Sequence, residues 1–299
     1  AHRSPRRVHA SNYFNPCAEY LPIEKIENGI IYTRDHRYVK LIEIVPINFL
    51  LRSAREQQNI IYSFISFLKV SPVKMQIKVL MQQADINHHV TIVHQEMEKE
   101  PDPHCRILQE DYLNLIGQLG SREATTRRFF IIFEYEQIGR RGNNEEADAV
   151  SSLQIAARTA TNYLKQCGNE VLNPDNEDEH TVEALYNILC RRKSAAVPLT
   201  SRVQEIVSQY VEAGRDTSSI PCGEFFAPGK IDITHGKYIC VDGLYHSYLL
   251  IPSQGYRAHV PAGWLSLLIN AGDGIDVDIF LIKQPKERMV QRLGQQLRI

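Results

Sequence analysis

The stretch VPAGWLSLLIN, residues 260–270, begins the part of the chain from which we predict the fold, and it reads as an apolar helix. Gly272 follows where the end of a helix favours a positive φ, and Asp273-Gly274 is typical of a tight turn. The next stretch, IDVDIFLI at 275–282, alternates with the two-residue period of a β-strand. Residues 260–282 therefore predict a helix, a turn and a strand in that order.

A last helix is predicted at 286–297, because Pro285 suits the first position of a helix. The apolar residues that follow recur on one face of such a helix, and they are Met289, Val290, Leu293 and Leu297. This end of the chain thus has the pattern helix, turn, strand, amphipathic helix.

The bulk composition is that of a globular protein. The chain has 299 residues, of which 43% are hydrophobic and 23% charged, so it is neither disordered nor membrane-spanning in character. A net charge of −1 gives no overall attraction to nucleic acid or acidic lipid. The six cysteines form no Cys-x-x-Cys motif, which favours reduced thiols over a zinc site or a disulfide framework.

The first half of the chain alternates strand and helix patterns. Ser53 and Glu56 form a capping box that opens a helix. In the strand at 73–79 we expect Lys74, Gln76 and Lys78 on a solvated face. The predicted elements are strands at 30–33 and 38–45, a helix at 53–69, a strand at 73–79, helical patterns at 86–97 and 108–119, a strand at 129–135, and a helix at 150–164 closed by Gly168. Pro101 and Pro103 interrupt the two helical patterns, which form either a helix pair or one helix kinked at the prolines.

The second half repeats these signals with shorter segments. Ser201 and Gln204 suggest a second capping box, and Asp242-Gly243 is a strong hairpin signal. The predicted elements are a short strand at 171–172, an acidic loop at 175–179, a helix at 182–189, a helix opened by Ser201, and strands at 231–234, 238–241 and 244–251.

We predict two folded domains. Residues 213–229 lose all periodicity and hold two prolines and three glycines, which marks a boundary. The division is an irregular N-terminal arm at 1–20, a first α+β domain at 21–213, a linker at 214–229, and a second, smaller α+β domain at 230–299.

The fold class predicted is α+β, with two ferredoxin-like layers of antiparallel sheet and helices packed on one face. The order ββαβα occurs twice along the chain. Its elements are 30–45, 53–69, 73–80 and 85–99, and then 238–251, 260–270, 275–282 and 286–297. Two interpretations remain open, an internal structural repeat and the coincidence of a common layer architecture.

The leucine-rich helix, the aspartate-flanked strand, the proline and the amphipathic helix of residues 256–299 resemble the end of the N-terminal region of conjugative-transfer and type IV secretion ATPases, the TraC/TrbE/CagE family. The resemblance continues at 28–45 and 121–136 and covers most of the chain. In that family this region precedes a motor domain with a phosphate-binding loop.

Motifs for nucleotide binding are absent from the sequence. Two Gly-Lys pairs, Gly229-Lys230 and Gly236-Lys237, lack both the following Ser or Thr and the upstream glycine of G-x-x-x-x-G-K-[ST]. Gly272 and Gly274 precede a strand, which is the wrong context for a dinucleotide fingerprint. We interpret these glycines as turn residues.

Metal and nucleophile patterns are equally weak. His88, His89 and His94 lack the spacing that puts two ligands on one helical face. Asp232, Asp276 and Asp278 fit acidic residues on solvated strand faces better than an acid pair. Cys105 has a histidine as direct neighbour, His104, but adjacent loop residues seldom align as a catalytic pair. We therefore expect no catalytic, cofactor-binding or metal-binding residue in this chain.

Clusters of basic residues are the last candidate for a binding site, here for nucleic acid. They are Arg127-Arg128, Arg140-Arg141 and Arg191-Arg192-Lys193, and acidic residues nearby compensate them. Cationic residues at helix ends that complement the helix dipole explain them without a nucleic-acid ligand.

The resemblance implies a non-catalytic N-terminal docking and assembly domain of a bacterial conjugation-type ATPase that powers DNA or protein transfer. ATP and magnesium are expected only in the motor domain, which this chain lacks. Implied partners are type IV secretion membrane components and further subunits of the same ATPase, often as a hexamer, at the cytoplasmic face of the inner membrane. The contact surface is expected to include the exposed side of strand 275–282.

Two alternatives remain. The first is a nucleic-acid-binding accessory protein of a mobile element that uses the arginine clusters, with affinity that falls steeply with salt. The second is a free-standing enzyme with a pocket built from Cys105, His104 and nearby acids.

Overall fold

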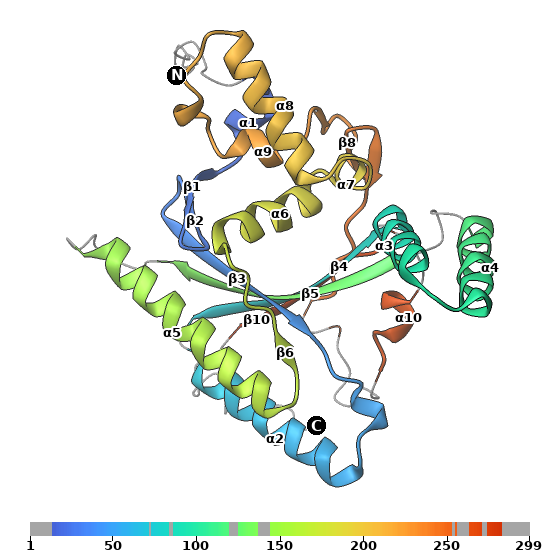
Figure 1. Cartoon of the computed structure of the whole chain (residues 1–299). Coiled ribbons are helices and arrows are strands. Elements are labelled where there is room, and N and C mark those ends of the chain that lie inside the picture. The colour runs from blue at the N-terminus through green and yellow to red at the C-terminus, as the bar shows by residue number, and fades with distance from the viewer. Residues whose placement is uncertain are drawn as a thin grey trace, which may run out of the picture. The chain divides into compact units, whose positions relative to one another are not determined.

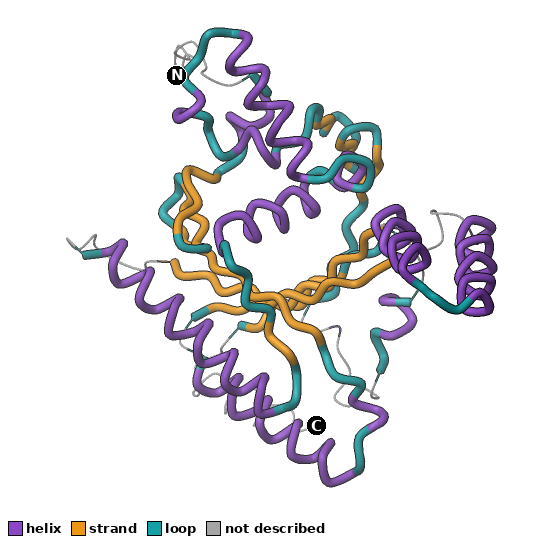
Figure 2. The backbone as a smooth tube through the Cα atoms, in the orientation of Figure 1, coloured by secondary structure: helices purple, strands orange, loops and turns teal. Residues whose placement is uncertain are grey.

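The computed structural model describes residues 14–71, 73–83, 86–119, 125–136, 144–252, 255, 263–270 and 274–282. The chain is an α+β protein with antiparallel sheets, as predicted (Figure 2). The helices are α1 (Pro16–Tyr20), α2 (Ala54–Val70), α3 (Ile86–Lys99), α4 (Pro103–Leu119), α5 (Glu145–Gln166), α6 (Glu177–Leu189), α7 (Arg191–Ser194), α8 (Leu199–Glu212), α9 (Gly223–Phe226) and α10 (Ser266–Ile269). The strands are β1 (Ile23–Glu27), β2 (Ile30–Thr33), β3 (Arg37–Val45), β4 (Lys74–Gln83), β5 (Thr125–Glu136), β6 (Glu170–Val171), β7 (Ile231–Asp232), β8 (Ile239–Val241), β9 (Leu244–His246) and β10 (Val277–Leu281).

Internal contacts divide the chain into two compact units whose segments alternate along the sequence. The first unit holds Ala1–Asp35, Leu80–Arg128 and Asp175–Asp276, and the second holds His36–Val79, Phe129–Pro174 and Val277–Ile299. The linker predicted at 214–229 contains α9, whose Phe226 is buried in a core cluster of the first unit. The division into domains at this linker stays a prediction.

The second unit has the strand order of a ferredoxin-like fold. The chain passes through β3, α2, β4, β5, α5 and β6, and the strands lie side by side in the order β6-β3-β5-β4. Helices α2 and α5 pack against each other, and α5 also packs on β3 (Figure 1). The predicted strand at 129–135 is thus the central strand β5, which explains its almost unbroken apolar sequence, FFIIFEY.

The buried face of helix α5, which contacts β3, is built largely of alanine. The buried residues follow helical spacing, and they are Ala149, Leu153, Ala156, Ala157, Ala160 and Leu164. The helix ends as predicted at Gly168, which has φ +83° and donates its N–H to the carbonyl of Lys165. Sequence periodicity therefore identified both the face and the end of this helix.

Helix α2 begins with the predicted capping box. Ser53 Oγ accepts the N–H of Glu56, and the Glu56 carboxylate accepts the N–H of Ser53 at 2.9 Å. The Ser53 hydroxyl also donates to the Glu56 carboxylate at 2.7 Å, and this bond, followed by the one from the Ser53 N–H, lowers the pKa of Glu56. A carboxyl with a lowered pKa stabilises the fold above its ordinary pKa, and the stabilisation is lost as the pH falls.

We expect Ser53→Ala to lower the free energy of unfolding by about 1 kcal/mol at pH 7, since the cap is lost. Between pH 7 and pH 4 the wild type should lose more stability than the variant, because the pKa of Glu56 returns toward its ordinary value in the variant. Urea unfolding at both pH values measures this. Equal losses in the two proteins would contradict the assignment.

In the first unit, the β1–β2 hairpin packs against α6. Its turn uses Asn28 and Gly29 at positive φ, and Asp178 Oδ1 accepts the N–H of Gly29 at 2.6 Å. The sequence analysis placed an acidic loop at 175–179 and missed β1. The loop prediction was wrong, because Asn176 caps α6 and the acidic residues Glu177, Asp178 and Glu179 form its first turn, where the helix dipole favours them.

The second predicted capping box was also wrong. Helix α8 starts at Leu199, and its N-cap is Pro198 with no side-chain cap, so Ser201 lies inside the first turn. The extended backbone of Pro198, at φ −60° and ψ 153°, decides where the helix begins. The hairpin predicted at Asp242-Gly243 is confirmed, with both residues at positive φ between β8 and β9.

Some of the remaining predictions concern residues that the structure describes, and others do not. Pro16–Tyr20 form a short helix capped by Asn15, although the sequence analysis expected an irregular arm at 1–20. Residues 1–13, the loop at 137–143 and the helix predicted at 286–297 lie outside the described residues. Strand β10 pairs with β4, so it extends the sheet that contains β3 and β5. The internal repeat stays a hypothesis.

Candidate interaction surface

One face of the edge strand β10 adds to the core of the second unit. The register pairs Val277 with Val79, Ile279 with Ile77, and Leu281 with Met75. Side chains that are paired across two strands lie on the same face. Met75 and Val79 are buried and the three β10 residues are half-buried, so this face of β10 adds to the core.

The opposite face of β10 begins with Asp278, which lies directly across from Lys78. The carboxylate of Asp278 accepts hydrogen bonds from Lys78 Nζ at 3.1 Å and from Gln76 Nε2 at 2.6 Å. Lys78 is buried, so the solvated position predicted for it was wrong. The reason is tertiary, because a strand about 200 positions away in the sequence supplies the covering carboxylate.

Asp276, just before β10, anchors the chain in the first unit. Its Oδ1 accepts the N–H of Met81 at 3.0 Å and lies 3.0 Å from Arg191 Nη1. Arg191 Nη2 in turn donates to the carbonyl of Met81. Met81 is fully buried, so this triangle satisfies both of its backbone polar groups.

Two apolar side chains remain exposed beyond these anchors, Phe280 at 64% and Ile282 at 70%. Strand β10 ends the strand order of its sheet, so among the described residues only one of its edges is paired. An edge strand with exposed apolar residues can accept a further strand or an apolar partner surface. The contact surface expected at 275–282 stays a prediction.

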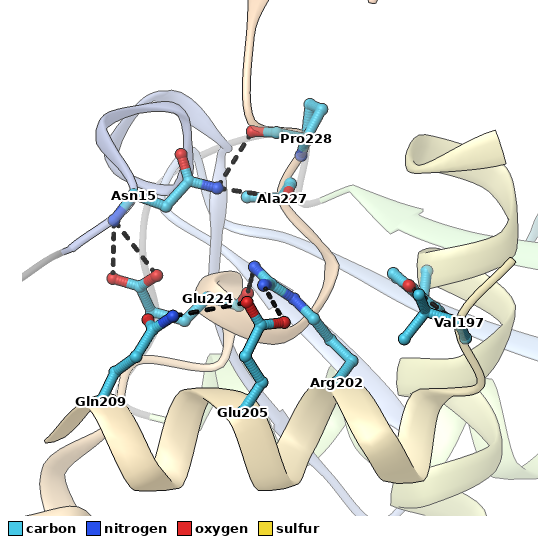
Figure 3. A network of polar contacts seen from close by, with 9 residues as sticks. Asn15, Val197, Arg202, Glu205, Gln209, Glu224, Ala227 and Pro228 are labelled. Atoms are coloured by element: carbon cyan, nitrogen blue, oxygen red, sulfur yellow. Dashed lines mark hydrogen bonds and ion pairs between the residues drawn. The ribbon is translucent and has the colours of Figure 1, made fainter. Parts of the chain in front are cut away.

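A buried carboxylate in the first unit holds the start of the described chain (Figure 3). Glu224 is 2% exposed, and its Oε1 accepts the N–H of Phe14 at 2.6 Å while its Oε2 accepts that of Asn15 at 3.2 Å. The Asn15 side chain donates to the carbonyls of Ala227 and Pro228. Sequence reasoning missed this cluster, because only its place between glycine and two phenylalanines sets Glu224 apart.

Buried Arg202 completes the same network from α8. Its guanidinium donates to the Glu224 carbonyl at 3.3 Å and to Glu205 Oε2 at 3.1 Å. Phe14 packs edge-on against Tyr210, with ring centroids 4.9 Å apart, and Arg215 lies over the Phe14 ring. These contacts join α8, α9 and the start of the described chain, so the network stabilises the first unit.

The proposed enzyme pocket around Cys105 is not supported by its surroundings. Cys105 is exposed, and its pKa is raised by partial desolvation and then by the carboxylates of Asp102 and Glu100. A raised pKa disfavours the thiolate that a nucleophilic cysteine needs. In the first unit, burial raises the pKa of Cys190 to about 12, and partial burial also raises that of Cys222, so both thiols disfavour the thiolate form.

No candidate metal ligands converge in the part of the chain that the structure describes, since no group of three or more His, Cys, Asp or Glu is placed to hold an ion. His94 is exposed on α3, and the side chains of His88 and His89 lie outside the description. Asp232 accepts hydrogen bonds from Thr234, which lower its pKa. The three aspartates singled out from the sequence thus each have a separate structural partner.

The arginines of the two described clusters make internal contacts. Arg127 donates to the carbonyl of Ile269, and Arg128 lies 3.2 Å from Glu183. Arg192 donates to the carbonyl of Asp242, and the neighbouring Arg191 bonds Asp276 and Met81. Arg140 and Arg141 lie outside the described residues.

The Gly-Lys pairs form turns near an aromatic group that sequence reasoning overlooked. The N–H of Lys230 donates to Asp242 Oδ1 at 2.8 Å, as in a hairpin, not a phosphate cradle. His235 stacks on Tyr238 at 4.6 Å, and Tyr245 meets the same ring edge-on at 5.1 Å. The available signal was the position of Tyr238 directly before β8 and of Tyr245 on the paired strand β9.

Comparison with known families gives one match. A sequence profile described as the archaeal TraC-like domain matches residues 24–183, which is more than half of the chain. None of the curated proteins matches the chain significantly. The matched family is described as archaeal, whereas the expectation from the sequence was a bacterial system. Among the described helices, none combines the length and the apolar character needed to cross a bilayer.

Proposed function

This chain belongs to the archaeal TraC-like domain family, and from that premise we propose that it is a docking and assembly region of a conjugation-type ATPase. Its role is to present surfaces, while ATP and magnesium bind to a motor domain that this sequence does not include. The partners are membrane components of a type IV secretion apparatus and further subunits of the same ATPase. These subunits form a hexamer, the arrangement common in such motors. The site of action is the inner face of the cell membrane.

The observation that carries this proposal is the edge strand β10. Residues outside the matched segment 24–183 supply β10, Arg191 and Asp276, which close and lock one edge of the sheet. Phe280 and Ile282 are then displayed at that edge. A fixed edge with exposed apolar side chains suits docking, because little conformational entropy is lost when a partner binds.

The test separates docking from catalysis in the full-length ATPase. We expect Phe280→Glu to lower the frequency of conjugative transfer by about a hundredfold, because a charge is placed in the apolar contact. ATP hydrolysis by the purified full-length variant should stay within about twofold of wild type. The control is Leu249→Glu, which changes a highly exposed apolar residue elsewhere.

Equal transfer by the Phe280→Glu variant and wild type would remove β10 as the docking surface. Loss of ATP hydrolysis in that variant would show that the strand serves the motor itself. The non-catalytic role has its own check, since titration calorimetry of this chain with magnesium and ATP should give no binding heat. Micromolar nucleotide binding would overturn that part of the proposal.

A second function has one observation in its favour, the aromatic group of His235, Tyr238 and Tyr245. Tyr245 is largely exposed, and Lys230 and Lys237 are exposed nearby in the same sequence segment. Exposed aromatic rings with neighbouring cations are typical of platforms on which single-stranded bases stack. Fluorescence anisotropy with a 20-nucleotide oligo-dT at low and high salt distinguishes this function, and Tyr245→Ala should weaken any binding about tenfold.

A further inference from the structure

The helical hairpin of α3 and α4 exposes an apolar stripe. The α4 stripe consists of Cys105, Leu108, Tyr112 and Leu115, which follow the alternating three- and four-residue spacing of a coiled-coil seam. Leu108 is 68% exposed and Leu115 is 51% exposed. The residues one position after Leu108, Tyr112 and Leu115 lie on an adjacent face and are half-buried; they are Gln109, Leu113 and Ile116. Helix α4 packs against α3. The stripe is therefore a second apolar face, which the hairpin itself does not cover.

The hairpin that carries the stripe is strongly acidic. Residues 86–119 contain six acidic and two basic residues, a net charge of −4, whereas the whole chain has −1. The acidic residues are Glu96, Glu98, Glu100, Asp102, Glu110 and Asp111. An apolar seam with this charge favours a basic amphipathic helix and disfavours pairing with an identical hairpin, whose charge would repel it.

The chain itself contains a sequence with these properties. Residues 283–299, KQPKERMVQRLGQQLRI, hold five basic residues and one acidic residue, a net charge of +4. Val290, Leu293 and Leu297 repeat the three- and four-residue spacing of the α4 stripe. The segment is thus predicted to be an amphipathic helix of opposite charge and matching period.

We propose that residues 283–299 of one copy pack along the α4 stripe of a second copy. We assign the occupant to a second copy because the described residues around α4 leave the stripe exposed. The two contact surfaces are different, so the association is head-to-tail and can continue from copy to copy. The inference deepens the assembly role proposed above by naming the surfaces between neighbouring subunits.

A binding experiment tests the complementary pair directly. A fluorescent peptide of residues 283–299 is titrated with the whole chain, and its anisotropy is followed. We expect saturable binding that weakens about fivefold or more between 50 and 500 mM salt, since the opposite charges are screened. The double variant Leu108→Gln/Leu115→Gln should bind at least about tenfold more weakly, because two anchors of the seam are lost.

The matched control is Ile107→Gln, which changes an apolar residue of α4 that is 55% exposed but lies off the stripe. This variant should bind the peptide within about twofold of wild type. Equal losses in the control and the stripe variant would overturn the proposal, as would binding of a scrambled peptide with the same affinity. Circular dichroism verifies that each variant keeps its helix content.

Sedimentation velocity tests the head-to-tail arrangement. The stripe variant Leu108→Gln/Leu115→Gln and the tail variant Leu293→Gln/Leu297→Gln should each be monomeric. Their mixture should form a dimer and nothing larger, because one protein supplies an intact tail and the other an intact stripe. Dimers of the tail variant alone would indicate pairing between two hairpins and contradict the proposal.

A wild-type chain that stays monomeric up to 100 µM would also contradict the proposal. These readouts are independent of conjugative transfer and of the Phe280→Glu variant. Failure of peptide binding would thus reject this interface and leave docking through β10 intact. Unchanged conjugative transfer by the Phe280→Glu variant would reject docking through β10 and leave this interface intact.

Discussion

Glu224→Ala is expected to lower the free energy of unfolding of the first unit by about 3 kcal/mol, because two backbone donors lose their buried, charged acceptor. The donors are the N–H groups of Phe14 and Asn15, which the Glu224 carboxylate accepts at 2.6 and 3.2 Å. Water cannot easily replace the carboxylate, since Glu224 is almost fully buried.

The readout is hydrogen exchange together with urea unfolding. The amides of residues 14–20 should exchange about a hundredfold faster in the variant, if the loss of stability falls mainly on this segment. Glu224→Gln should have a smaller effect, because its amide still offers one acceptor oxygen.

The matched control is Glu205→Ala, which removes a carboxylate of the same network that accepts a hydrogen bond from Arg202. Glu205 is half exposed, so its loss should cost less than about 1 kcal/mol. Equal effects at the two positions would contradict the assignment of Glu224 as the anchor of the N-terminal segment.

Asp276→Ala is expected to destabilise the first unit by about 2 to 3 kcal/mol, because it leaves the mostly buried guanidinium of Arg191 without a carboxylate to balance its charge. The buried N–H of Met81 also loses its acceptor. Hydrogen exchange of the amides in 80–83 and thermal unfolding both report the change.

The double variant Asp276→Ala/Arg191→Met should recover part of the loss, since it removes the unpaired charge and fills the space with an apolar chain. A coupling energy of at least about 1 kcal/mol between the two positions is expected. Arg192→Met is the control. The guanidinium of Arg192 is exposed and donates to the carbonyl of Asp242. If Arg191→Met and Arg192→Met lowered the free energy of unfolding equally, the contacts among Arg191, Asp276 and Met81 would not stabilise the unit specifically.

The candidate surface was only partly predictable. The two-residue period of 275–282 identified a strand with one apolar face, and β10 has that alternation. Its neighbour could not be predicted, because the pairing with β4 joins residues about 200 positions apart. For the same reason Asp276 and Asp278 looked like ordinary solvated acids, whereas each pairs with a cation and a further polar group.

Failed local predictions have a different cause. Ser201 and Gln204 fit the capping pattern as well as Ser53 and Glu56 do, yet only the second pair forms it. Both patterns describe a local preference worth about 1 kcal/mol. Such a preference is overridden where the preceding chain, here Pro198, already sets the start of the helix.

The sequence by itself determined the features that depend on residues a few positions apart. These include the capping box at Ser53, the glycine end of α5 at Gly168, the hairpin turn at Asp242-Gly243 and the break between α3 and α4. The energies of caps, turns and periodic burial arise within a few residues, so they can be read along the chain. Tertiary structure alone decided the strand order, the burial of Glu224 and the pairing of Lys78 with Asp278. Those outcomes depend on which distant segments meet, because a buried charge is stable only where folding brings it a partner.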